Sequence, residues 1–78
     1  MAQKLTFTYN READILYIDK RAPYKEQESE ELGDDVIARL NPATGEIENL
    51  EVLFFTTRLL DKKLFELPVT AEIHRAAS

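Results

Sequence analysis

The sequence predicts a small α+β domain, in which an antiparallel sheet of four to five strands is followed by one C-terminal helix. Three observations predict this class. Short runs that alternate between apolar and polar residues recur between residues 4 and 55, which is the period of a strand. Turn-forming residues separate these runs, and the period becomes helical after Thr56. The 78 residues leave room for one domain, expected to span residues 1–78.

The first two expected strands form a hairpin. Residues 4–9 alternate apolar, β-favouring residues with threonine, and residues 14–19 follow a polar turn that begins at Asn10. The second strand carries Tyr17 on one face and Ile18 on the other. Because apolar residues on both faces need cover, we expect this strand to lie inside the sheet.

The acidic middle of the chain allows two structures. Residues 25–32 are nearly all polar, which suits either a solvated loop or an exposed edge strand. Residues 33–35 then form a break, and residues 36–40 are the next expected strand, with Val36, Ala38 and Leu40 on one face.

The clearest turn signal lies at residues 41–46. Pro42 favours a type I turn, and Gly45 suits the left-handed position that returns the chain to a strand. We expect the partner strand to follow directly and to pair with residues 36–40.

That partner strand spans residues 47–55, with Phe55 on the face opposite Leu50. Ile47 is out of phase with Leu50. A bulge near residues 48–49 would explain this, because one inserted residue reverses which side chains face the core.

The expected helix begins at Thr56 or Thr57, either of which can cap the first turn, and ends before Pro68. Three leucines recur at helical spacing: Leu60, Leu64 and Leu67. For residues 68–74, a short last strand and a second short helix both remain open.

Composition narrows the classes of function. The formal net charge of −5 disfavours binding to nucleic acid and to anionic membranes. No apolar run approaches the roughly 20 residues of a membrane span, and the N-terminal residues lack the apolar block of a signal peptide. The absence of cysteine excludes disulfides and thiolate metal sites. We expect a cytoplasmic protein without a cofactor.

One segment resembles a known family. YNREADILYI, at residues 9–18, is similar to the opening motif of small bacterial proteins known as domain of unknown function 2283. Their pattern is Tyr-Asp-x-Glu-Ala-Asp, an apolar residue and Leu-Tyr-Ile, and Asn10 stands where the second position is usually Asp. The acidic segment, residues 35–40 and the hairpin to residue 53 also fit. The resemblance implies a small bacterial α+β domain and no catalytic residue.

Glu12 and Asp14, beside Tyr17, are the first candidates for chemistry. They could form a carboxylate pair for acid–base catalysis or for a metal ion. They could also be a turn acid and a strand-entry acid that are solvated or satisfy local backbone donors. We favour the second interpretation, because acid–base catalysis needs a pocket that drives two pKa values apart, and the sequence predicts no pocket.

The other candidates for catalysis are weak. His74, the only histidine, lies near the C-terminus beside Arg75, where we expect it to be exposed. Ser29 and Ser78 have no base other than His74 with which to form a triad, and the sequence contains no glycine-rich phosphate loop. We therefore expect no enzymatic activity.

The sequence favours a non-enzymatic protein-interaction module that forms a homodimer. In an antitoxin-like version, an acidic surface would bind a basic protein. Six residues would form that surface: Glu26, Glu28, Glu30, Glu31, Asp34 and Asp35. Large apolar residues that one helix cannot cover would form the dimer contact: Phe7, Tyr17, Leu53 and Phe55. The alternative is a protein that binds a small ligand or a divalent metal through the acids near the first hairpin.

Overall fold

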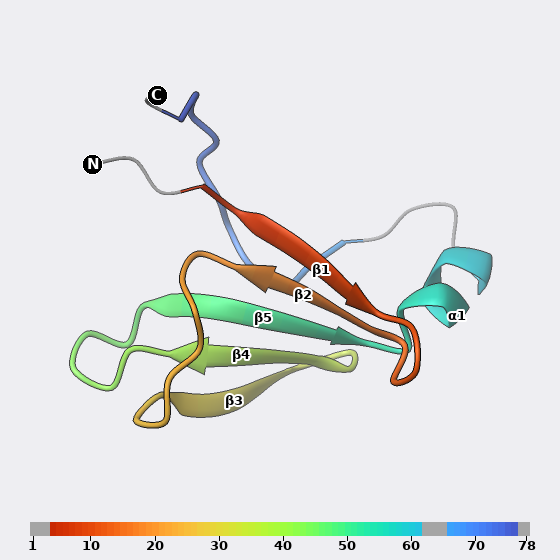
Figure 1. Ribbon diagram of the computed structural model, residues 1–78, viewed down its shortest axis with the longest axis horizontal. Coiled ribbons are helices and arrows are strands. Elements are labelled where there is room, and N and C mark those ends of the chain that lie inside the picture. The colour runs from red at the N-terminus through yellow and green to blue at the C-terminus, as the bar shows by residue number, and fades with distance from the viewer. Residues whose placement is uncertain (1–3, 62–65, 77–78) are drawn as a thin grey trace.

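A computed structural model describes residues 4–61 and 66–76. These residues form a five-stranded antiparallel sheet and one helix, so the predicted α+β class is confirmed (Figure 1). The strand order is β1-β2-β5-β4-β3. The elements in chain order are β1 (Thr6–Asn10), β2 (Ile15–Asp19), β3 (Glu28–Gly33), β4 (Val36–Leu40), β5 (Ile47–Leu53) and α1 (Phe55–Asp61).

The first hairpin has the predicted pairing with shifted ends. β2 lies between β1 and β5, which confirms the prediction of a central strand. β1 begins at Thr6 rather than at residue 4, and Asp14 belongs to the turn, where its φ is 57°. The side chain of Asn10 accepts a hydrogen bond from the backbone N–H of Ala13 at 3.1 Å, which holds the turn.

The acidic segment forms β3, so the edge-strand alternative is the one that the structure adopts. Asp34 and Asp35 make the two-residue turn to β4, with φ values of 55° and 60°. Positive φ at both positions is the geometry of a type I′ turn, which matches the right-handed twist of the two strands.

The predicted turn at residues 41–46 and the predicted bulge near residues 48–49 are both confirmed. Gly45 has a φ of 77°, and its N–H donates to the carbonyl of Asn41 at 2.8 Å. Leu40 pairs with Ile47, whereas the preceding residue of β4 pairs with Asn49. Glu48 is therefore the inserted residue, and its insertion lets Ile47 and Leu50 face the same side of the sheet.

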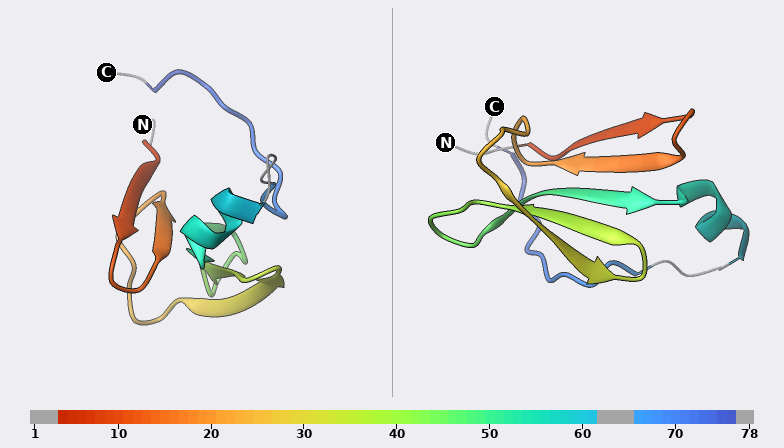
Figure 2. Two further views of the ribbon diagram at one scale, coloured as in Figure 1. Left: turned by 90° about the vertical axis from the view of Figure 1, so that its right-hand side faces the viewer. Right: turned by 90° about the horizontal axis from the view of Figure 1, so that it is seen from below.

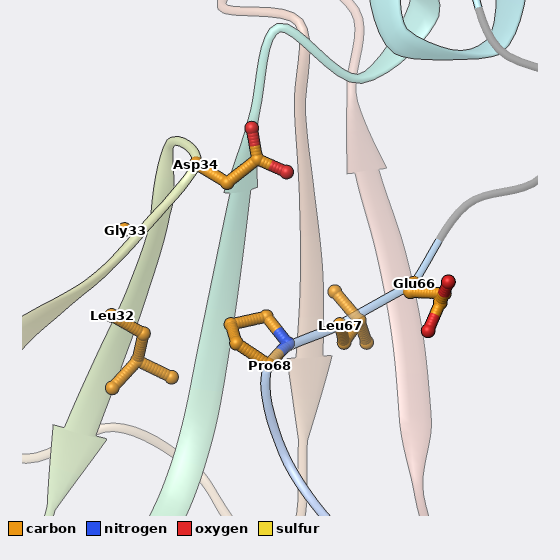
Figure 3. Close-up of a pocket in the computed structure, with 6 residues that line it drawn as sticks. All are labelled: Leu32, Gly33, Asp34, Glu66, Leu67 and Pro68. Atoms are coloured by element: carbon orange, nitrogen blue, oxygen red, sulfur yellow. The ribbon is translucent and has the colours of Figure 1, made fainter.

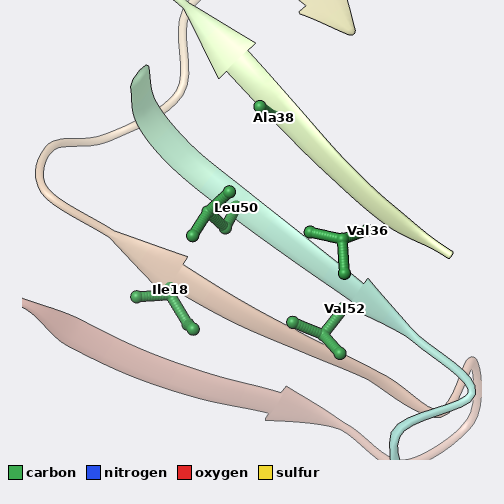
Figure 4. Packing of buried hydrophobic residues seen from close by; sticks show 5 residues of the cluster. All are labelled: Ile18, Val36, Ala38, Leu50 and Val52. Atoms are coloured by element: carbon green, nitrogen blue, oxygen red, sulfur yellow. The ribbon is translucent and has the colours of Figure 1, made fainter. Parts of the chain in front are cut away.

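The sheet is curled, and the core lies on its concave face, where α1 and the C-terminal segment also lie (Figure 2). Figure 4 shows the buried apolar side chains of β2, β4 and β5 that form it: Ile18, Val36, Ala38, Leu50 and Val52. The predicted common face of Val36, Ala38 and Leu40 is confirmed.

The end of β5 differs from the prediction. The strand stops at Leu53, and Phe54 takes a φ of 53°, which turns the chain into α1. Phe55 therefore packs against the concave core, and its ring centroid lies 5.9 Å from that of Tyr9. The prediction that Phe55 lies opposite Leu50 is wrong, because the alternation of side chains ends where the extended backbone ends.

α1 also differs from the expected helix. It begins at Phe55, so neither predicted threonine is its N-cap residue. Leu60 is 87% exposed, and the buried residue of the helix is Arg58. Leu64 lies outside the described residues.

The segment after α1 has neither of the two predicted structures. Over residues 68–74 it forms no strand and no helix. Leu67 and Val69 nevertheless pack against the concave core, which gives this irregular segment a structural role.

Candidate functional site

Asp14 links the first hairpin to the helix. Its carboxylate accepts hydrogen bonds from the backbone N–H of Thr56 at 3.0 Å and from the hydroxyl of Thr56 at 2.8 Å. The hydroxyl of Tyr9 donates to the same carboxylate at 2.6 Å. A carboxylate at this place satisfies an unpaired N–H group in the first turn of α1, although it comes from a residue distant in sequence.

These contacts shift two ionisation equilibria. The hydrogen bonds from Tyr9, and then from Thr56, lower the pKa of Asp14 below its ordinary value. The hydrogen bond to Asp14 raises the pKa of Tyr9. Glu12 is exposed on the turn. Asp14 thus has a structural role, as the favoured interpretation expects, but its donors are the hydroxyl of Tyr9 and the distant Thr56 rather than the local backbone.

A second polar cluster, the Glu48 cluster, lies at the bulge of β5. Glu48 is only 7% exposed, and its carboxylate accepts hydrogen bonds from the hydroxyl of Tyr24 at 2.7 Å and from the amide of Gln27 at 3.0 Å. The hydrogen bond from Tyr24, followed by that from Gln27, lowers the pKa of Glu48. The same contact with Glu48 raises the pKa of Tyr24.

Asn49 extends this cluster to the end of β2. It is 2% exposed, and its amide donates to Asp19 at 2.8 Å and to the carbonyl of Arg21 at 2.6 Å. The guanidinium of Arg21 lies 4.7 Å from the ring centroid of Tyr24, within the range of a cation–π contact. Through these contacts the cluster ties the connection between β2 and β3 to the bulge of β5.

The Glu48 cluster is internally satisfied. Among residues 4–61 and 66–76, no buried side-chain nitrogen or oxygen lacks a hydrogen-bond partner. Such satisfaction is typical of a structural network. Sequence reasoning missed the cluster, although the phase change at Ile47 was a signal that the next residue occupies a special position.

Two broad hollows lie near the β3–β4 turn. The larger, of about 430 Å³, is lined by six residues: Leu32, Gly33, Asp34, Glu66, Leu67 and Pro68 (Figure 3). The other, of about 320 Å³, lies beside α1, where Arg58 pairs with Asp34 at 3.2 Å. Arg58 also donates to the carbonyl of Leu53 at 3.0 Å. These contacts show that Arg58 fixes the helix to the sheet.

The predicted acidic residues form a line along one edge of the sheet. Glu28 and Glu30 pair across from Leu40 and Ala38 on the concave side, whereas Glu31 pairs with Ile37 on the convex side. All three glutamates are exposed. The other three predicted acids are also exposed, at the two ends of this strand: Glu26, Asp34 and Asp35.

This acidic line is not a built metal site. The described residues contain no group of three or more histidine, cysteine, aspartate or glutamate side chains placed to hold a metal ion. The carboxylates instead alternate between the two sides of β3, as the pleat of a strand requires.

The predicted dimer residues lie on two different faces. Phe7 and Phe55 are on the concave side, whereas Tyr17 and Leu53 are on the convex side. The four residues therefore do not form one continuous surface. Tyr17, Leu53 and Phe55 are half-buried, and Phe7 is 61% exposed.

The strongly exposed apolar side chains that the sheet carries gather on β1 and the residue before it. Leu5 is 55% exposed, and Tyr9 is 40% exposed. The pairing of Tyr9 with Leu16 places Tyr9 on the concave side with Phe7, and Leu5 directly precedes the strand. We call Leu5, Phe7 and Tyr9 the β1 stripe.

The predicted exposure of His74 is confirmed, and its Nε2 atom lies 3.6 Å from the carboxylate of Glu72. No helix among the residues that the structure describes is long and apolar enough to cross a membrane.

The fold and these contacts define a small α+β domain in which Asp14 and the Glu48 cluster make structural hydrogen bonds. Residues 6–55 match the family described as "Protein of unknown function (DUF2283)", and the chain belongs to that family. The match contains all five strands and ends at the first residue of α1. No curated protein and no solved structure matches the chain.

Proposed function

We propose that the protein is a non-enzymatic protein-interaction module that acts as a homodimer. The exposure of the β1 stripe supports this proposal, since apolar side chains gathered on a surface commonly mark an interaction site. A chain of 78 residues also has little core with which to stabilise itself, and a partner subunit would add to it.

The acidic edge of the sheet, β3, supports the proposal of a further partner, a protein of opposite charge. Glu28, Glu30 and Glu31 are exposed along β3, on both sides of this edge, and no salt bridge to any of them is found within the described segments. Carboxylates in this arrangement attract a basic protein and speed its association at low salt. The antitoxin-like version of the proposal is that this partner is a small basic toxin, neutralised in the cytoplasm.

Charge neutralisation tests the acidic edge. The triple variant Glu28→Gln/Glu30→Gln/Glu31→Gln should fail to retain a stoichiometric basic protein that the wild type captures from its host. A matched triple variant that removes the same charge elsewhere, Glu12→Gln/Asp61→Asn/Glu72→Gln, should retain it. Equal capture by both variants, or no captured protein with the wild type, would contradict an acidic docking edge.

Sedimentation equilibrium tests the homodimer separately. We expect the wild type to have the mass of two chains at micromolar concentration. A single-chain mass throughout that range would remove the homodimer from the proposal.

A further inference from the structure

We propose that the second copy of the chain docks on β1, so that the two sheets join edge to edge through antiparallel β1 strands. This inference rests on the proposed homodimer and assigns its contact surface. The surface differs from the four residues expected from the sequence, because the structure divides those residues between two faces of the sheet.

The two edges of the sheet are built differently. β3 carries three glutamates and a register shift between Glu31 and Gly33. Charged side chains and bulges are the features by which proteins protect an edge from pairing with another strand. β1, at the opposite edge in Figure 1, contains no charged residue and no proline, and its pairing with β2 is continuous from Thr6 to Asn10. The molecule therefore protects β3 and leaves β1 competent to pair.

The main chain of β1 offers the groups that such pairing needs. In an antiparallel ladder, alternate residues direct their N–H and C=O groups to one neighbour, and the residues between them direct theirs to the other side. β2 occupies one side of β1, and no described strand occupies the other. A strand from a second copy would satisfy the outward groups.

Self-pairing also covers the β1 stripe. Two identical antiparallel strands related by a two-fold axis normal to the sheet form a self-complementary interface. The same axis keeps both concave faces on one side of the joined sheet. The β1 stripe of one copy then lies next to that of the other, and the exposed aromatic rings of Phe7 and Tyr9 gain apolar neighbours.

Charge favours pairing of β1 with the β1 strand of a second copy rather than with an acidic edge such as β3. The chain carries a net charge of −5, yet β1 is neutral, and the glutamates of β3 lie at the far edge of the sheet. Contact through β1 thus keeps the β3 glutamates of the two copies at opposite ends of the joined sheet, where they repel each other least.

Single-cysteine crosslinking tests the geometry directly, because the sequence contains no cysteine. Cysteine is placed at each position of β1 in turn, from Thr6→Cys to Asn10→Cys, and disulfide-linked dimer is measured after mild oxidation. We expect one maximum, at the position that faces its own copy across the two-fold axis, with lower yields on both sides. Ser29→Cys on β3, the matched edge control, should give little dimer. Equal yields at β1 and at Ser29, or none along β1, would overturn the assignment.

A charge substitution provides the equilibrium test. Thr8→Lys, at the centre of β1, should weaken dimerisation by at least about tenfold in sedimentation equilibrium, since each copy then brings a positive charge into the joined edge. Ser29→Lys should leave the dimer unchanged, and circular dichroism checks that both variants fold. A dimer that persists in Thr8→Lys would refute docking on β1 while leaving the homodimer intact. A monomeric wild type would refute both.

Discussion

The carboxylate of Glu48 lies against the hydroxyl of Tyr24 and the amide of Gln27, and both groups donate hydrogen bonds to it. A charged carboxylate with little solvent exposure is tolerated when hydrogen bonds replace its water. The stability of the charged form appears in the lowered pKa of Glu48. At the scale of the residue, this acid contributes to folding through its ionised state.

The lowered pKa gives a prediction for acid unfolding. A carboxyl group whose pKa is lower in the folded state stabilises the protein above its ordinary pKa, and this contribution is lost as the pH falls through the folded-state value. We expect Glu48→Gln to destabilise the protein at neutral pH and to differ less from wild type at about pH 3. Urea unfolding at both pH values measures the difference. A difference that stays constant with pH would contradict the role of the ionised carboxylate.

Tyr24→Phe is the matched variant at the other end of this hydrogen bond. It removes the hydroxyl that contributes most to the shift, so the pKa of Glu48 should rise towards its ordinary value. Acid unfolding of Tyr24→Phe should then begin at a higher pH than that of the wild type. NMR titration of the Glu48 carboxyl provides the direct measurement.

At the scale of the element, turns determine where the strands end. Asp34 and Asp35 hold left-handed conformations in a type I′ turn, the turn type for which glycine and asparagine are preferred. The carbonyl of Asp35 accepts the N–H of Leu53 at 2.9 Å, so this turn also anchors the end of β5. A residue with a Cβ atom is strained in that conformation, and the strain is retained here.

Asp35→Gly should therefore stabilise the protein, by about 0.5–1 kcal/mol, because glycine adopts a positive φ without steric cost. Urea unfolding at neutral pH is the measurement. Asp35→Ala removes the same charge and keeps a Cβ atom without the preference of asparagine for this conformation, so it should bring no gain. An equal gain from both variants would assign the effect to charge rather than to the backbone.

The elements differ in how far the sequence predicts them. The alternation of apolar residues predicted four strands, and the phase of Ile47 predicted the bulge that the structure confirms. The helix start was predicted poorly, because its side-chain cap comes from Asp14 in a distant hairpin. The burial of Arg58 was also missed, since a partner as distant as Asp34 is invisible in local periodicity.

At the scale of the whole molecule, the concave core is small. Its buried apolar residues are five in the described part of the chain, and α1 and the irregular segment at Leu67 and Val69 lie over them. The family match covers the sheet and ends at Phe55. The segment with Leu67 and Val69, which helps to cover the concave face, thus lies outside the matched region.

Val52→Ala tests how much this core contributes to the stability of the protein. Val52 is fully buried, and loss of its two methyl groups should cost about 2 kcal/mol. In a domain of this size, that loss should lower the Tm by about 10 °C. Val69→Ala, the same change at a half-buried position, should have a smaller effect in thermal unfolding. Equal effects would mean that the C-terminal segment supports the core as strongly as β5 does.

The sequence by itself determined the class, the approximate positions of four strands and their turns, and the acidic character of one segment, because periodicity and turn chemistry are local properties of the chain. Only the tertiary structure decided that this acidic segment is one edge strand of the sheet and that the uncharged β1 is the other. It also decided that Phe7 and Tyr17 face opposite sides. Edge position and the occupant of a face depend on which distant strands pair. Short-range patterns do not record that information.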